Sequence, residues 1–324
     1  MRWYQHRYHS PLSLRIVFGT IPRLPRWSHP PIAVVTAAIF FCLLRAERRA
    51  VLRNLAVVTG RSGWRLWGSV YRVFYNFCDF VVSYCYVPRA SHQELLAMLS
   101  HPDRGEAIIE AALGGGRGLV VWTAHVANWE FASRLLELHG RPVKVARVVE
   151  RDNPAERQLR DLMTNERLTA IDLLDPLASI RLLHALRAGE IVAMQGDRVF
   201  RGKGLVAPFF GRPTVFPPGP FHLAHAAGVA VVPGLVARTG WLRYRMIVGE
   251  PLPLDHAKDR DAAVGEALAS GVSFLEAHLR RWHCQWLNFY DFWPADRVEP
   301  AAPEAAPDRA GSPRASCTDP SQSR

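Results

Sequence analysis

The chain has 324 residues, of which 49% are hydrophobic and 21% charged, so it is long and apolar enough for one large α/β domain with appendages. Its formal net charge of +11 favours an anionic partner, but the sequence has no zinc-finger spacing, RNP-like aromatic motif or heptad-plus-basic region, which argues against nucleic acid. The 5 scattered cysteines fit neither a disulfide framework nor a zinc site and favour a reducing compartment.

Residues 1–46 are predicted to form a basic and apolar membrane-associating segment. Residues 32–44 (IAVVTAAIFFCLL) are an apolar run followed directly by an arginine-rich stretch. The run is shorter than the ~20 residues that a membrane-spanning helix needs. No small-residue cleavage site follows it, so a removed secretory signal is not expected. The run predicts a helix that lies in or dips into a membrane face. A buried core helix and a marginal span extended back through Trp27 are the alternatives.

Residues 47–294 are predicted to form one domain. Helices are expected up to residue 99, with Gly60 and Pro88 as stops. From about residue 105, short apolar runs alternate with amphipathic stretches. That alternation predicts an α/β fold with a mostly parallel central sheet flanked by helices. The expected strands are 119–122, 143–149, 191–195, 229–237 and 243–249, and the expected helices are 130–138, 154–167, 177–188, 217–227 and 258–282.

The C-terminal segment and two short motifs limit the extent of the domain and the classes of enzyme to be considered. Residues 295–324 are rich in Pro, Ala and Ser and are predicted to be a disordered tail. The GGGRG run at residues 114–118 lacks a Gly-Lys-Ser/Thr ending and precedes a strand, so it predicts a helix-to-strand turn and not a phosphate loop. No GxSxG elbow occurs, which disfavours a serine hydrolase.

His125 is the main candidate for catalysis. It follows the predicted strand 119–122 in LVVWTAHVANWEFA, and Asn128 is a plausible N-cap for the helix that comes next. His125 therefore lies at the carboxyl end of this strand, and ligands bind at the carboxyl ends of the strands in open α/β sheets. Because a turn separates His125 from Glu130, the two side chains can converge. Glu130 would then hold the imidazole in one tautomer while its other nitrogen takes a proton from a hydroxyl.

The same block carries a family resemblance. HVANWE resembles the His-x4-Glu/Asp block of the lysophospholipid acyltransferase superfamily, and specifically of its lipid A biosynthesis (lauroyl/myristoyl) acyltransferase branch, which commonly has Gly at the position of Ala127. ARVVERDNPAERQLRDL, the stretch from GEIVAMQGDR to VAVVP, and CQWLNFYDFW resemble further segments of that branch, so the match covers roughly residues 45–294. In the last segment Asn288 and Asp291 replace a more usual His or Arg-Trp ending, which raises a different acceptor as an alternative.

The resemblance implies an enzyme that moves a fatty acyl chain from a thioester of acyl carrier protein or coenzyme A to a hydroxyl of a lipid A-like glycolipid. It implies a location at the bacterial inner (cytoplasmic) membrane, with the catalytic domain on the cytoplasmic side. His125 would be the general base and Glu130 its orienting partner. Because a thioester is already activated, the enzyme needs only to position it and stabilise the oxyanion, so no metal or bound cofactor is expected.

Basic residues around this block are the candidates for substrate binding. Arg147 or Arg151, with backbone N–H groups at the helix start near Asn128, would bind anionic oxygens or the developing oxyanion. Asp197 is interpreted as fixing an arginine, helping to bind the acceptor, or forming a structural ion pair. FFGRP at 209–213 would line the acyl channel or pack in the core, and the basic loop after Asp197 suits a phosphate group or is simply solvated. The predicted substrate-binding residues are Asn128, Arg147, Arg151, Asp197, Arg198, Arg201, Lys203 and Arg212.

Two alternatives to a lipid A-type enzyme stay open. The acceptor could be a lysophospholipid, an aminolipid or another glycolipid, because the terminal segment is altered. The chain could also be an inactive relative that only binds lipid or acyl carrier protein. The presence of both His125 and Glu130 argues against a pure binding protein, since binding alone requires neither.

Overall fold

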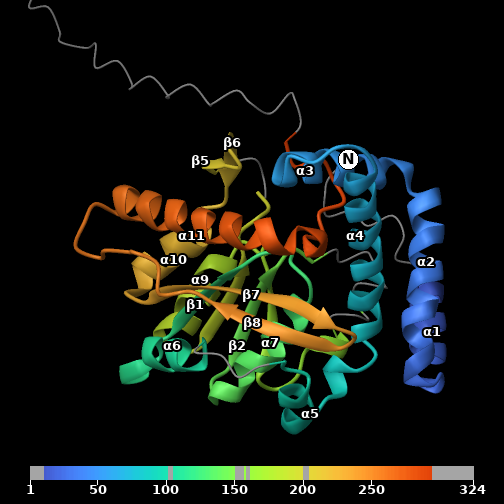
Figure 1. The fold of residues 1–324 in the computed structure, drawn as a ribbon. Coiled ribbons are helices and arrows are strands. Elements are labelled where there is room, and N and C mark those ends of the chain that lie inside the picture. The colour runs from blue at the N-terminus through green and yellow to red at the C-terminus, as the bar shows by residue number, and fades with distance from the viewer. Residues whose placement is uncertain (1–10, 101–104, 150–156, 158–160, 200–203, 294–324) are drawn as a thin grey trace, which may run out of the picture.

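The computed structural model describes residues 11–100, 105–149, 157, 161–199 and 204–293 (Figure 1). Arg151, Arg201, Lys203 and the predicted tail at 295–324 therefore lie outside the described residues, as do residues 154–156 and 158–160 of the predicted helix 154–167. The division of the chain at residues 46 and 294 stays a prediction.

A six-stranded, mostly parallel sheet forms the centre of the molecule and confirms that the chain has an α/β fold with a mostly parallel central sheet. The strand order is β3-β2-β4-β1-β7-β8, and only the β7–β8 pair is antiparallel. A separate hairpin pairs β5 with β6. The five predicted strands are all present, while β3, β5 and β6 were not predicted. The strands are β1 Leu119–Thr123, β2 Val143–Arg147, β3 Leu168–Asp172, β4 Ile191–Gln195, β5 Leu205–Phe209, β6 Arg212–Phe216, β7 Ala230–Gly240 and β8 Arg243–Val248.

Helices cover both faces of the sheet, and the alternation of β1 side chains shows how. Val120 and Trp122 point into a core shared with α9 (Ala178–Arg187), α10 (Gly219–Ala227) and α11 (Arg260–Trp282). Leu119 and Val121 point to the opposite face, into a core shared with α6 (Gly105–Ala112) and α7 (Trp129–Leu136). Successive side chains of a strand face opposite sides, so a continuous apolar run is needed where both faces are covered.

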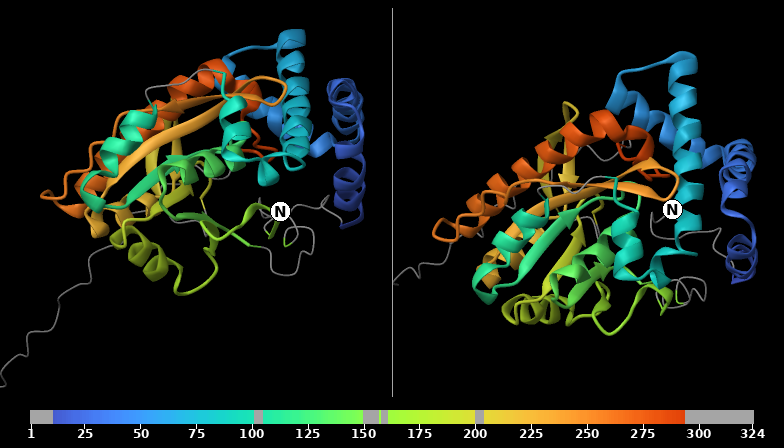
Figure 2. Two further views of the ribbon diagram at one scale, coloured as in Figure 1. Left: turned by 90° about the horizontal axis from the view of Figure 1, so that it is seen from below. Right: turned by 60° about the horizontal axis from the view of Figure 1, so that its bottom comes forward.

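Four longer helices precede the sheet and stand beside it (Figure 1). Gly60 ends α3 with φ 63, as predicted for a left-handed C-cap. In both views of Figure 2, α1 and α2 lie on the outer side of α4. The helices are α1 Pro11–Thr20, α2 His29–Leu43, α3 Arg45–Thr59, α4 Gly63–Ser83 and the short α5 His92–Ala97; 3-10 turns are Ile21–Arg23, Arg26–Ser28, Val87–Arg89, Gly114–Gly116, Glu137–His139 and His283–Gln285.

The predicted apolar run forms α2, and its two sides differ. The small residues Ala33 and Ala37 are buried on the side that packs against α4, whereas Val35 is 59% exposed and Leu43 70% exposed. Within the described part of the chain, no single helix has the length and hydropathy to cross a membrane; by those two criteria alone, Arg26–Leu43 and Arg45–Thr59 pass as a pair bent by 97°. Membrane association stays a prediction.

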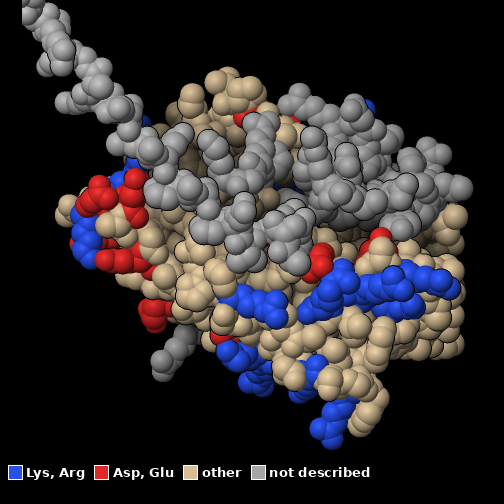
Figure 3. Space-filling model, turned by 90° about the horizontal axis from the view of Figure 1, so that it is seen from above, with Lys and Arg blue, Asp and Glu red and all other residues tan. Residues whose placement is uncertain are grey.

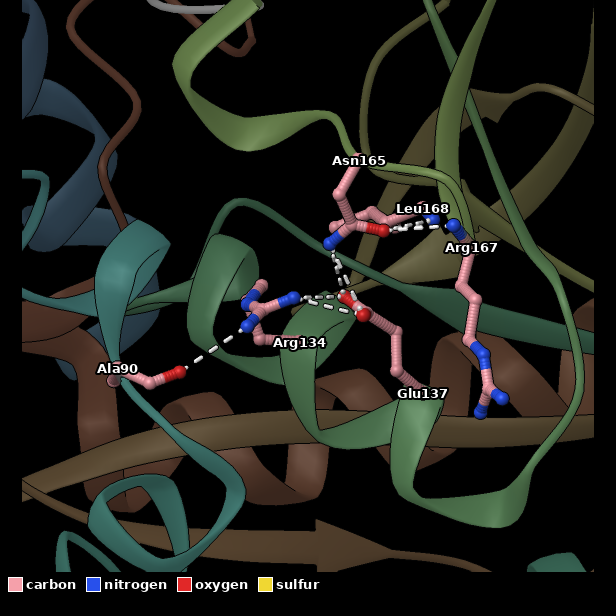
Figure 4. Close-up of polar contacts among 6 residues, drawn as sticks. All are labelled: Ala90, Arg134, Glu137, Asn165, Arg167 and Leu168. Carbon is pink, nitrogen blue, oxygen red and sulfur yellow. Dashed lines mark hydrogen bonds and ion pairs between the residues drawn. The ribbon is translucent and has the colours of Figure 1, made fainter.

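A buried polar network fixes the C-terminal end of α7 (Figure 4). Nη1 of Arg134 donates to both carboxylate oxygens of Glu137 at 2.7 Å, and its Nη2 donates to the carbonyl of Ala90. Asn165 donates its amide to Glu137 and accepts from the backbone N–H groups of Arg167 and Leu168. The network ties α7 to the start of β3 and to the segment before α5. It therefore holds the helix that begins next to His125.

Candidate active site

The loop between β1 and α7 presents His125. Asn128 ends this loop: its side-chain oxygen accepts from the N–H of Phe131, and its amide donates to the Tyr244 hydroxyl. Both groups of the buried Asn128 side chain are thus used inside the protein, which makes it a helix cap. Ala127 has φ 47, in the left-handed region that favours glycine. Glycine, the residue that the family resemblance led us to expect here, adopts this conformation without steric cost.

Asp197, two residues beyond the end of β4, is the partner of the imidazole. Because β1 and β4 are adjacent and parallel, the segments that follow them meet at one edge of the sheet. Nδ1 of His125 lies 2.7 Å from Oδ1 of Asp197, and the backbone N–H of His125 donates to Oδ2 at 3.2 Å. An ionised carboxylate only accepts hydrogen bonds, so Nδ1 carries the proton. Nε2 is then the nitrogen that can accept a proton from a substrate.

The surroundings of this pair keep the imidazole neutral. Burial, followed by the positive charge of Arg198, lowers the pKa of His125 to about 4, even though Asp197 acts in the opposite direction. Burial alone would raise the pKa of Asp197, but His125, Arg198 and the indole N–H of Trp286 together hold that pKa well below its usual range. At neutral pH the site therefore contains a neutral imidazole and a carboxylate. Such an imidazole is ready to act as a base.

Glu130 does not occupy the place expected from the sequence. Its Oε1 accepts a hydrogen bond from the Tyr84 hydroxyl at 3.0 Å and lies 3.7 Å from Nη1 of Arg147. The structure gives the role of imidazole partner to Asp197 instead. The reason is that Glu130, in the first turn of α7, faces Tyr84 at the end of α4, whereas Asp197 arrives from the neighbouring strand. Tyr84 was not identified from the sequence.

The other predicted substrate-binding residues are not all together. Arg147, with a side chain 23% exposed, lies beside Glu130. Arg198 is directed into the protein, where it donates to the side-chain oxygen of Asn288 and to the carbonyl of Leu287. Arg212 is exposed on β6, opposite Phe209 in the hairpin, while Phe209 itself is fully buried against aromatic rings. The core-packing alternative for FFGRP is thus the one that Phe209 supports.

A C-terminal segment, residues 285–288, completes the site. Trp286 donates its indole N–H to Oδ2 of Asp197 at 3.0 Å, and its backbone forms an antiparallel bridge with Val126. Asn288 donates its amide to the same oxygen at 3.4 Å. The sequence singled out this segment for its resemblance to the family and for its altered ending, and it gave Trp286 no role in the site. Within the described residues, no group of three or more His, Cys, Asp or Glu side chains could hold a metal ion.

The fold and the site define an α/β enzyme with a buried imidazole–carboxylate pair at the carboxyl edge of its sheet. The chain belongs to the family of bacterial lipid A biosynthesis acyltransferases, whose family model matches residues 12–289. It is 29% identical over 249 residues to the phosphatidylinositol mannoside acyltransferase of Mycobacterium tuberculosis strains CDC 1551 / Oshkosh and ATCC 25618 / H37Rv. The alignment covers 74% of this chain and 72% of those relatives. The protein is therefore an acyltransferase, which confirms the resemblance.

Proposed function

We propose that the protein transfers a fatty acyl chain from a thioester of acyl carrier protein or coenzyme A to a hydroxyl of a glycosylated lipid. The observation that carries this proposal is the buried His125–Asp197 pair in a chain of this acyltransferase family. The name of the family refers to lipid A biosynthesis, and the two relatives are named phosphatidylinositol mannoside acyltransferases. Both are lipids that carry sugar hydroxyls, so a glycolipid acceptor agrees with both.

In the proposed mechanism, His125 is the general base. Nε2 removes the proton from the acceptor hydroxyl as its oxygen attacks the thioester carbonyl, while Asp197 keeps Nδ1 protonated and the ring in place. The new C–O bond forms, the C–S bond breaks, and the proton on Nε2 passes to the departing thiolate. The base is thereby returned to its neutral form. Because the thioester is activated, positioning and oxyanion stabilisation complete the catalysis.

Glu130 takes a different part in this mechanism from the one expected. Its carboxylate lies between the Tyr84 hydroxyl and the Arg147 guanidinium, and it holds the latter close to His125. Arg147 and the backbone N–H groups at the start of α7 would stabilise the oxyanion or bind anionic oxygens of a substrate. Arg201, Lys203 and Arg212 stay proposed contacts for a phosphate group on the acceptor.

The N-terminal helices form the proposed contact with the cytoplasmic side of the inner membrane. The outer side of α2 exposes large aliphatic side chains, and Trp64 at the start of α4 is 79% exposed. Tryptophan is enriched where membrane and water meet. Lys and Arg gather in a band along one side of the molecule (Figure 3). Exposed arginines of α3, α4 and the turn between them are Arg45, Arg49, Arg53, Arg61, Arg65 and Arg72.

The proposed function is tested by mass spectrometry of total lipids from cells that express the intact chain or its His125→Ala variant. A glycolipid heavier by one acyl chain is expected with the intact chain, and the variant should form it about 10³-fold more slowly, because the general base is lost. His139→Ala is the matched control, since Nδ1 of His139 also lies 2.7 Å from a carboxylate oxygen, on Glu110.

Two outcomes of this experiment, and one outcome of fractionating the same cells, contradict parts of the proposal. Full activity of the His125→Ala variant removes His125 from the mechanism. A folded protein that adds no acyl chain to any glycolipid supports the binding-only alternative. Recovery of the intact chain entirely in the soluble fraction of lysed cells contradicts the membrane contact.

A further inference from the structure

The two oxygens of Asp197 have different partners. Oδ1 accepts from Nδ1 of His125, whereas Oδ2 accepts from the backbone N–H of His125, from the indole of Trp286 and from the amide of Asn288. The carboxylate is almost completely buried, so these donors replace water. Two side chains donate to Oδ2. The indole nitrogen of Trp286 is 3.0 Å away and the amide nitrogen of Asn288 is 3.4 Å away. The indole is therefore the stronger side-chain restraint on Oδ2.

The segment that carries Trp286 also holds the loop that carries His125. The N–H of Ala127 donates to the carbonyl of Gln285 and the N–H of Leu287 donates to the carbonyl of His125, both at 2.8 Å. These bonds flank the antiparallel bridge between Val126 and Trp286. One short segment thus fixes the base through its backbone and the carboxylate through a side chain.

The Trp286 ring is itself held firmly. It is buried and contacts Phe209, Phe292 and Trp293, with ring centroids 6.1, 4.8 and 6.0 Å away. The segment that follows is anchored to α3 by Asn54, whose amide donates to the carbonyls of Asn288 and Tyr290 and whose oxygen accepts from the N–H of Phe292. The indole N–H is therefore a preorganised donor, and a rigid supporting group keeps its partner in one orientation.

From these contacts, and resting on the proposed function of His125 and Asp197, we propose that Trp286 is a positioning residue for acyl transfer: its indole N–H holds Oδ2 of Asp197 so that Oδ1 faces Nδ1 of His125. Residues 285–288 (QWLN) then position the His125–Asp197 pair. The altered ending of this segment had suggested a role in acceptor recognition instead. Removal of the N–H leaves the carboxylate with less stabilisation of its charge. The proton affinity of the carboxylate rises, the imidazolium beside it is favoured, and the pKa of His125 rises.

The test compares Trp286→Phe with Trp293→Phe in the full-length protein in detergent. Trp293 belongs to the same aromatic cluster, and its indole N–H donates to the Thr214 hydroxyl at 2.8 Å, so both variants lose one indole hydrogen bond. The pKa of His125 is measured by NMR titration of ring-labelled histidine, with the His125 signal identified by its absence from His125→Gln. Trp286→Phe should raise that pKa by a few tenths of a unit or more, and Trp293→Phe should leave it unchanged.

Steady-state kinetics with the donor and acceptor that the intact protein uses give the second readout. Trp286→Phe should lower kcat about tenfold with little change in KM, and should move the acid limb of the pH profile upward; Trp293→Phe should do neither. An unchanged His125 pKa and unchanged kcat in Trp286→Phe, or equal effects in both variants, would overturn the proposal. If Trp286→Phe does not fold, 3-benzothienylalanine at residue 286 keeps the ring shape without the N–H, and the same outcomes decide.

The two readouts separate this proposal from the function on which it rests. The NMR titration reports on the contact between Trp286, Asp197 and His125 without any substrate. If His125→Ala retains acyl transfer while Trp286→Phe shifts the His125 pKa, the proposed base is wrong and Trp286 loses its role in the reaction. If His125→Ala is inactive and Trp286→Phe behaves like Trp293→Phe, only the role of Trp286 falls.

Discussion

The two ends of α7 each have a histidine–carboxylate pair, and the pairs have the same length. Nδ1 lies 2.7 Å from a carboxylate oxygen both in His125–Asp197, before the helix, and in His139–Glu110, after it. The Asp197 side chain is 0% exposed and receives further donors on its second oxygen, whereas the Glu110 side chain is 61% exposed on the surface of α6. The distance therefore does not distinguish a site from a surface contact, and neither does burial of the imidazole, since the His139 side chain is 9% exposed and the His125 side chain 11%. Burial of the carboxylate, its supporting donors and its position at the carboxyl edge of the sheet do distinguish them.

The largest difference between the two histidine–carboxylate pairs is expected when each carboxylate is replaced by its neutral amide. Asp197→Asn should reduce kcat/KM about 10³-fold, because the amide no longer selects the tautomer with the proton on Nδ1. Glu110→Gln should leave kcat/KM within about twofold, since a screened surface pair contributes little. Initial rates with one donor and acceptor measure both. Equal losses in the two variants would show that the burial of Asp197 is not what matters.

The buried pair Arg134–Glu137 tests whether burial alone, without a place at the active site, affects activity. Arg134→Leu leaves the Glu137 carboxylate buried without its guanidinium partner and should lower the free energy of unfolding by about 3–5 kcal/mol. The folded fraction should keep its kcat. Denaturant unfolding and active-site-normalised rates measure the two effects, and Arg134→Leu/Glu137→Leu should recover much of the loss. A large fall in kcat at unchanged stability would place this network in the mechanism.

The pH profile tests the surroundings of His125 directly. Because the pKa of His125 is lowered to about 4, the neutral base is present at all pH values above that, so kcat/KM should be flat from about pH 5 to neutrality. Below pH 4 it should fall about tenfold per unit as the imidazole is protonated. Initial rates over pH 3.5–8, with stability checked at each pH, provide the measurement. An acid limb near 6.5 would mean that the site is hydrated like the surface.

The smallest expected effect concerns the loop that carries the base. Ala127→Gly should raise the free energy of unfolding by about 1 kcal/mol, because glycine adopts a positive φ without steric cost. Chemical denaturation measures it. Since the Ala127 N–H bond to Gln285 does not depend on the side chain, kcat should stay within about twofold. Destabilisation by the substitution would show that Ala127 is not strained in this loop.

The sequence predicted the interior strands of the sheet and the edge strand β8, but it missed β3 at the opposite edge. The strands that became β1, β4 and β7 are apolar runs, because helices cover both of their faces. Strand β3, at the edge, reads LTAID and has only one fully buried residue, so it lacked that signal. The buried and exposed residues of the hairpin β5–β6 alternate, but hydrophobicity does not, because Val206 and Val215 are apolar residues on its exposed side. Each strand also contains a proline, Pro208 or Pro213, which argues against a strand in the sequence.

The sequence predicted the parts of the site that lie close together along the chain. The strand, turn and capped helix around His125 lie within a few residues, so the position of His125 at the sheet edge followed from the sequence. The choice of Glu130 over Asp197 shows the limit. That Asp197 meets His125 depends on β4 lying next to β1, a contact between residues 72 positions apart, and that Trp286 meets Asp197 depends on a contact 89 positions apart. No local pattern reports such neighbours.

The position of the 285–288 segment in the chain has a consequence for biosynthesis. The base, its carboxylate and the indole that supports the carboxylate are encoded in that order, and a ribosome makes them in that order. A nascent chain that has reached residue 200 already contains His125 and Asp197, yet the segment that donates to Asp197 and pairs with the His125 loop has still to be made. Long-range contacts of this kind form late in folding. The geometry of the site is therefore completed only when nearly the whole domain has been translated, so prematurely terminated chains would lack an ordered site.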